Sequence, residues 1–86
     1  MIEHLLRVVA KNHLMDFHLL EKSLPITKHE AEVLLWVAHG KTNREIGEIL
    51  SLSPRTINKH LEQLYPKIEV DNRSAATSIA IRTLLL

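Results

Sequence analysis

From Pro25 onward, apolar residues recur at helical spacing in four short stretches, and a polar residue that can cap a helix precedes each stretch. The first stretch follows Thr27, which stands three residues before Glu30 in the spacing of a capping box. It stops at Gly40, a residue suited to the left-handed position after a helix. A second pair, Thr42 and Glu45, repeats the capping box. The pattern therefore predicts one helix up to Gly40 and a short one over 43–50.

The third and fourth stretches also have defined starts. Ser53 precedes Pro54, and proline is favoured at the first helical position because its missing N–H would have no partner there. We expect a helix over about 54–65, which Pro66 ends early, and a last helix capped by Asn72 that runs from Arg73 towards Leu85. The inward positions expected in the four stretches are Ala31, Val33, Leu34, Val37, Ala38, Ile46, Ile49, Leu50, Ile57, Leu61, Leu64, Ala75, Ala76, Ile79, Ala80 and Leu84.

The segment before Pro25 has its own helical spacing of apolar residues over about 2–22. We interpret it as one helix, or as two with a break near Asn12 and His13. Proline disfavours the α conformation at the preceding Leu24, so we place a boundary there. We interpret residues 1–24 as an N-terminal helical extension or linker and residues 25–86 as one domain. Two roles fit the extension: a linker that packs on the domain, or a helix that dimerises.

Composition then narrows the class of protein. A chain of 86 residues with 3% aromatic residues, two glycines and three prolines favours one small aliphatic helical domain. Without cysteine there is no disulfide scaffold, thiolate zinc site or cysteine nucleophile. The six histidines contain no pair three or four residues apart, so we expect no metal. We find no glycine-rich phosphate loop or catalytic constellation, and expect neither an enzyme nor a cofactor. No apolar run is long enough for a bilayer, and the start does not resemble a signal peptide, so we expect a cytoplasmic protein without membrane contact.

Charge adds a local signal. The formal net charge is only +1, so any field that attracts nucleic acid has to be local. The stretch 53–60 holds Arg55 and Lys59 and no carboxylate, and it begins at a helix N-terminus, where free N–H groups favour phosphate. A short helix, a tight turn and a longer capped helix are together typical of a helix-turn-helix.

Four consecutive strings make this interpretation more specific: ITKHEAEVLL, GKTNREIGEIL, SLSPRTINKHL and KIEVDNRSAA. In this order and spacing, the sequence from Ile26 to about Thr83 resembles the LuxR-type (LuxR/GerE) DNA-binding domain of bacterial transcription regulators. The resemblance implies an all-α fold, a four-helix LuxR-type helix-turn-helix domain, preceded here by an extra N-terminal helix. It further implies sequence-specific binding of double-stranded DNA, with the helix at about 54–65 in the major groove, as in a response regulator output domain.

The resemblance also implies roles for single positions. The family's base-reading positions fall on Asn58, Lys59 and Glu62. Positions that contact the DNA backbone are Thr42, Asn43, Arg44, Ser53, Thr56 and Lys67, and side-chain chemistry adds Lys41 and Arg55 to them. We expect a homodimer on DNA through the last helix, with Ala76, Ile79, Ala80 and Thr83 in the interface, and RNA polymerase as a further candidate partner.

Four residues depart from the family pattern. Glu62 stands where many members carry a basic residue, so it either accepts a hydrogen bond from cytosine or repels some sequences. Gly47 replaces the usual alanine where two helices cross, and we expect Gly47→Ala to be tolerated, with a gain of up to about 1 kcal/mol. Glu69 replaces a frequent glycine, which predicts a more strained turn, and Pro66 lies near the end of the third helix.

The alternative function is a helical protein-interaction module without DNA binding. Aliphatic helix faces and a nearly neutral charge fit it, but it gives no reason for the absence of carboxylates from Ser53 to Lys59. Two aromatic side chains, those of Trp36 and His60, allow both a structural and a functional interpretation. Trp36 could stack on a base, but its apolar neighbours favour a partly buried core position. We interpret His60 as a packed or phosphate-facing residue.

Overall fold

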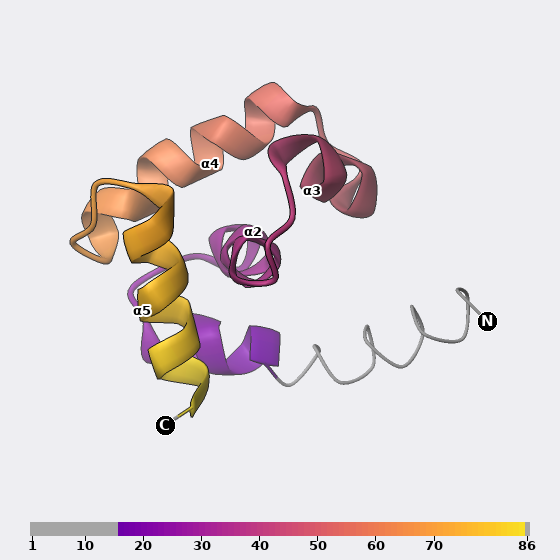
Figure 1. Cartoon of the computed structure of the whole chain (residues 1–86). Coiled ribbons are helices and arrows are strands. Elements are labelled where there is room, and N and C mark those ends of the chain that lie inside the picture. The colour runs from indigo at the N-terminus through magenta and orange to yellow at the C-terminus, as the bar shows by residue number, and fades with distance from the viewer. Residues whose placement is uncertain (1–15, 86) are drawn as a thin grey trace.

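The computed structural model describes residues 16–85 of the chain, and the regular elements among them are all helices. Residues 16–23 form a helical segment, which is followed by α2 (Lys28–Ala38), α3 (Asn43–Leu50), α4 (Pro54–Lys67) and α5 (Arg73–Leu85). Figure 1 shows α2 in the centre, with α4 across the top, α3 on one side and α5 on the other. The predicted all-α class is confirmed, while residues 2–15 of the predicted first helix lie outside the described part.

Local capping chemistry sets the helix starts. The Glu30 amide donates to Thr27 Oγ1 at 3.2 Å, and the Thr27 amide donates to Glu30 Oε1 at 2.9 Å. Thr42 and Glu45 form the same pair of bonds at the start of α3. Both predicted capping boxes are confirmed, and they satisfy amides that a helix start leaves without partners.

The core is aliphatic and α2 lies at its centre, where Val33 and Leu34 are fully buried. Phe17 and Leu20 are also buried, so the segment 16–23 packs into the same core as the helices after Pro25. Trp36 packs against this cluster and is half-buried, as its neighbours predicted. The remaining core residues are Ile26, Ala31, Leu35, Val37, Ile46, Ile57, Leu61, Leu64, Ile68, Ala76 and Ala80.

One inward prediction is wrong, because Ile49 is 44% exposed. On the helix circumference of α3, the buried arc runs from Ile46 through Leu50 to Gly47, and Ile49 lies on the other side of Ile46. The buried arc of α3 is therefore narrower than the number of its apolar residues suggested.

The end of α4 also differs from the expectation. The helix continues through Pro66 to Lys67, because a proline in the last turn removes only one amide donor. The turn then closes with a bond from the Ile68 amide to the Leu64 carbonyl and another from the Val70 amide to the Tyr65 carbonyl. Glu69 has a φ of 59°, so the predicted strain at this turn is confirmed.

The surroundings of Gly47 also differ from the expectation that alanine would be tolerated there. It is buried where α3 meets the turn before α4, and a Cβ at this position would overlap the carbonyl oxygen of Leu52. Since the obstructing atom belongs to the backbone, it can move only with the whole turn. Gly47→Ala is therefore expected to destabilise the domain, and the prediction of a gain is corrected.

Candidate nucleic-acid interface

The unit formed by α3, a short turn and α4 places the candidate interface. Ser51 adopts the left-handed conformation with a φ of 60°, and the Leu52 amide donates to the Gly47 carbonyl at 2.8 Å. Ser53 then starts α4, with its hydroxyl accepting from the Thr56 amide at 3.1 Å. Because α3 and α4 pack on each other, the start of each helix is held relative to the other.

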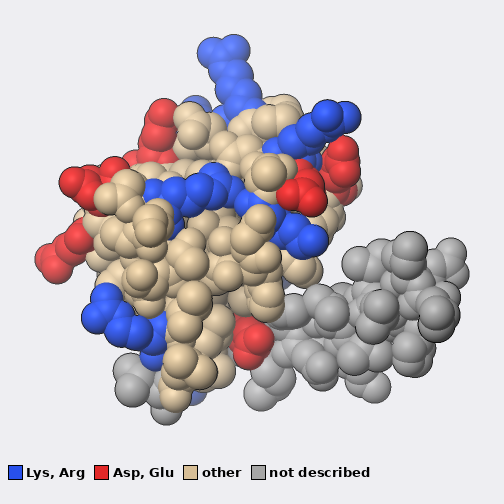
Figure 2. Space-filling model, in the orientation of Figure 1, with Lys and Arg blue, Asp and Glu red and all other residues tan. Residues whose placement is uncertain are grey.

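Positive charge gathers on this unit. Residues 41–67 include five basic and three acidic residues, whereas the rest of the chain has six basic and seven acidic ones. Figure 2 shows basic side chains projecting at the top of the domain, the side of α4 in Figure 1, with acidic ones beside them. The positive electrostatic field is therefore local, with acidic side chains among the basic ones, as expected from the small net charge.

The outward face of α4 brings the three predicted base-reading residues together. Arg55, Asn58, Lys59 and Glu62 follow the spacing of one helix face and line a surface hollow of about 430 Å³. All four side chains are exposed. Asn58 Nδ2 donates to Glu62 Oε1 at 3.0 Å, so these two side chains form one polar unit.

Two residues predicted to contact the DNA backbone lie at the start of α4. Ser53 is the N-cap of α4 and Thr56 lies in its first turn, with their hydroxyl oxygens 2.9 Å apart. The same turn has no acidic residue. Exposed Arg44, near the start of α3, lies 3.7 Å from Glu48, an exposed pair that contributes little to stability.

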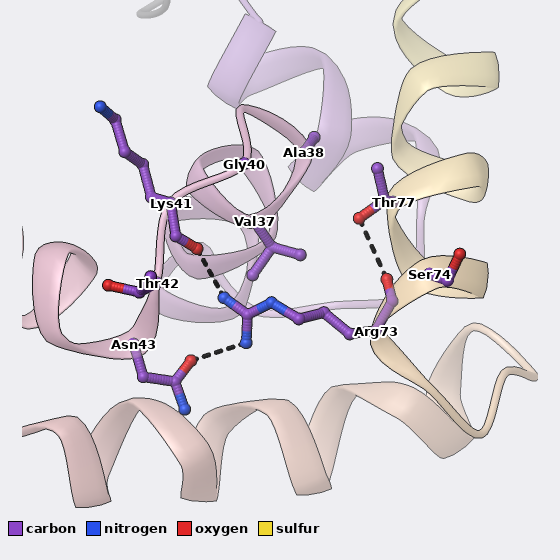
Figure 3. Close-up of a pocket in the computed structure, with 9 residues that line it drawn as sticks. All are labelled: Val37, Ala38, Gly40, Lys41, Thr42, Asn43, Arg73, Ser74 and Thr77. Carbon is purple, nitrogen blue, oxygen red and sulfur yellow. Dashed lines mark hydrogen bonds between the residues drawn. The ribbon is translucent and has the colours of Figure 1, made fainter.

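Arg73 is a residue that sequence analysis did not single out. From the start of α5 it donates to Asn43 Oδ1 at 2.7 Å and to the Lys41 carbonyl at 2.6 Å, as the dashed lines in Figure 3 show. It thereby holds the connection between α2 and α3 and the first residue of α3, where the residues predicted to contact the DNA backbone are Lys41, Thr42 and Asn43. No local signal marks this pairing, because Asn43 and Arg73 are 30 residues apart.

The Arg73 contacts lie beside a surface hollow of about 610 Å³ between the start of α5 and the α2–α3 connection. Figure 3 shows the residues that line it: Val37, Ala38, Gly40, Lys41, Thr42, Asn43, Arg73, Ser74 and Thr77.

Lys67 has a partner within the domain. Its Nζ lies 2.8 Å from Glu30 Oε1 and 3.0 Å from Oε2, and the Glu30 side chain is only 3% exposed. Burial by itself raises the pKa of Glu30, but the hydrogen bonds from Lys67 and Thr27 and the charge of Lys67 outweigh it and lower the pKa. The predicted phosphate contact of Lys67 would compete with this ion pair.

The predicted dimer interface needs a correction on α5. Ala76 and Ala80 are fully buried in the core of their own domain, so they cannot contact a second copy. Ile79 and Thr83 are half-buried. The physical reason is that small side chains let α5 pack closely on α2. The outward positions of α5 are Ser74, Ser78, Ile81, Arg82 and Leu85.

A histidine pair also links two helices. The rings of His29 on α2 and His60 on α4 are nearly parallel, at 11°, with centroids 6.1 Å apart. This agrees with a packed His60. Among residues 16–85, no group of three or more histidine, aspartate or glutamate side chains is placed to hold a metal ion.

Comparison with known proteins identifies the class. Residues 24–80 match the family described as bacterial regulatory proteins, luxR family. The chain belongs to this family, and the resemblance drawn from its sequence strings is confirmed.

Individual relatives are longer than this chain. The transcriptional regulatory protein LiaR of Bacillus subtilis is 39% identical over 69 residues, which cover 77% of this chain and 33% of LiaR. The regulatory protein SdiA of Escherichia coli is 34% identical over 79 residues, 92% of this chain and 33% of SdiA. The transcriptional activator protein SolR of Ralstonia solanacearum is 41% identical over 66 residues, 77% of this chain and 28% of SolR. The chain thus spans about a third of the length of these relatives.

No solved structure gave a significant match. Within the described residues, the helices are too short or too polar to cross a membrane.

Proposed function

We propose that this chain binds double-stranded DNA sequence-specifically, as the DNA-binding part of a bacterial transcription regulator, with α4 in the major groove. The observation that carries the proposal is the exposed face of α4. It presents Arg55, Asn58, Lys59 and Glu62 on a capped helix, and each can meet a base edge or a phosphate. The transcription regulators among its relatives support this assignment.

The phosphate contacts follow from the same docking. With α4 in the major groove, α3 would cross the DNA backbone, and we place the starts of both helices near phosphates. Amides, hydroxyls and cations at these starts are suited to phosphate oxygens. The residues proposed for this role are Lys41, Thr42, Asn43, Arg44, Ser53, Arg55 and Thr56.

Two copies are proposed to bind together, related by a two-fold axis, on half-sites about 10 base pairs apart or less. The outward side of α5 supports this arrangement, since Ile81 and Leu85 leave 43% and 80% of their surface exposed. Sedimentation at saturating protein should give two chains per operator, and one chain per operator would contradict the pairing.

Fluorescence anisotropy with a labelled random duplex, at several salt concentrations, tests DNA binding itself. We expect binding at low salt, with the logarithm of the affinity falling linearly with the logarithm of the salt concentration. A folded chain that does not bind at low salt would contradict the proposal and favour a protein-interaction module.

A further inference from the structure

The carboxylate of Glu62 sits among the groups that α4 presents outward. It is the only acidic residue of α4, and it shares the exposed hollow with Arg55 and Lys59. DNA repels a carboxylate, so a carboxylate on this face lowers affinity for any duplex unless a base returns a specific bond. On a face that binds DNA, Glu62 would therefore contribute to selectivity rather than to general affinity.

The hydrogen bond from Asn58 gives this carboxylate a fixed place. Asn58 Nδ2 donates to Oε1 of Glu62 at 3.0 Å across one turn of α4. Within residues 16–85, Glu62 has no other hydrogen bond or ion pair, so Oε2 remains open to a donor from outside. An asparagine that holds a carboxylate in this way acts as a positioning residue.

An ionised carboxylate only accepts hydrogen bonds, which limits the bases that fit it. In the major groove, guanine presents two acceptors and thymine presents an acceptor and a methyl group. Adenine has an amine donor next to the N7 acceptor, which would face the carboxylate. Cytosine presents its 4-amino group without a neighbouring acceptor, and is the base that accommodates Glu62 best.

Resting on the DNA-binding function proposed above, we propose that Glu62 makes the domain require cytosine at one position of each half-site, by accepting a hydrogen bond from its 4-amino group, with Asn58 as the positioning residue. Arg55 and Lys59, on the same face, offset the repulsion between Glu62 and the phosphates. Lys59 is free to donate to a guanine nearby, because within the described residues it has no hydrogen bond or ion pair.

Selection from a pool of random duplexes, followed by affinity measurements, tests this inference on the whole chain. The wild type should select half-sites with one invariant cytosine and bind them about tenfold more tightly than duplexes with another base there. Glu62→Gln keeps the size of the side chain but can donate as well as accept. It should lose most of this discrimination, admit adenine or guanine, and bind scrambled DNA more tightly than the wild type. Glu32→Gln, which removes the same charge from α2, should keep the cytosine requirement.

A second measurement isolates the contact. We replace the 4-amino group of the selected cytosine by hydrogen and compare wild type, Glu62→Gln and Asn58→Ala. The base change should weaken the wild type about tenfold and Glu62→Gln much less, with Asn58→Ala between them. An unchanged cytosine requirement in a folded Glu62→Gln variant would overturn this inference and leave the DNA-binding function in place. A folded wild type that selects no duplex would overturn both.

Discussion

Lys67→Met should destabilise the domain because it leaves the carboxylate of Glu30 buried without its cation. The variant keeps an aliphatic chain of similar length but removes the contacts of Nζ at 2.8 and 3.0 Å. The Thr27 amide, at 2.9 Å, would remain as a partner of the carboxylate. Hydrogen bonds to charged groups contribute about 1.5–3 kcal/mol, and breaking a fully buried ion pair costs about 3–5 kcal/mol.

The Lys67 side chain is 40% exposed, so solvent screens the pair and the lower range applies. We expect a loss of about 2 kcal/mol at neutral pH. For a domain of this size, the melting temperature should fall by roughly 10 °C. Urea unfolding followed by circular dichroism measures the free energy, and Lys22→Met, at an exposed lysine in the segment 16–23, is the matched control. The control should change stability by less than about 0.5 kcal/mol.

The pH dependence gives this prediction a sharper form. In the folded wild type the pKa of Glu30 is lowered. The stabilisation it brings is therefore fully present above the unfolded pKa, about 4.3, and is lost as the pH falls through the folded pKa. Without Lys67, burial is opposed only by Thr27. The difference between wild type and Lys67→Met should be largest near pH 7 and should shrink at acid pH, as the pH falls through the lowered pKa of Glu30 in the wild type. An equal loss at both pH values would refute the role assigned to the pair.

Three further substitutions test the fold and the site. Gly47→Ala should lower the free energy of unfolding by about 1 kcal/mol, because overlap with the Leu52 carbonyl outweighs the better helix propensity of alanine. Chemical denaturation measures this free energy, and an increase would contradict the close approach. Glu69→Gly should raise that free energy by about 0.5–1 kcal/mol in the same assay, since glycine adopts a φ of 59° without strain; no gain would show that the turn is relaxed. Arg73→Met should leave a folded chain whose DNA affinity falls to a similar degree for preferred and scrambled duplexes, because Asn43 loses its hydrogen bond from Arg73. Unchanged DNA affinity in anisotropy titrations would contradict the positioning role of Arg73.

Local chemistry explains why so much of the fold could be predicted from the sequence. Thr27 with Glu30 and Thr42 with Glu45 are each three residues apart, so the bonds that start α2 and α3 follow from neighbours in the chain. The pairing of Lys67 with Glu30 joins residues 37 positions apart, and no spacing rule indicates it. The same holds for Arg73 and its partners on the α2–α3 connection.

Helix faces were harder to predict than helix limits. In α5 the apolar residues lie around much of the circumference, so their positions alone do not tell which arc faces α2. Ala76 and Ala80 were assigned to an intermolecular surface, whereas packing against α2 uses their small size inside the domain. The need for glycine at position 47 could not be predicted either. It arises from the carbonyl oxygen of Leu52, five residues later, which leaves no room for a side chain. The roles of Asn58, Lys59 and Glu62 at base edges stay predictions.

The most direct test of the central claim compares Lys59→Ala with Lys41→Ala on one selected operator and one scrambled duplex, at several salt concentrations. Lys59 lies on the exposed face of α4, and Lys41 lies before α3 in the connection that Arg73 holds. Lys59→Ala should weaken binding to the operator by roughly 1–3 kcal/mol more than binding to the scrambled duplex. Lys41→Ala should weaken both to a similar degree and reduce the salt slope by about one unit. Unchanged DNA affinity in both folded variants would contradict the assignment of α4 as the helix that reads DNA.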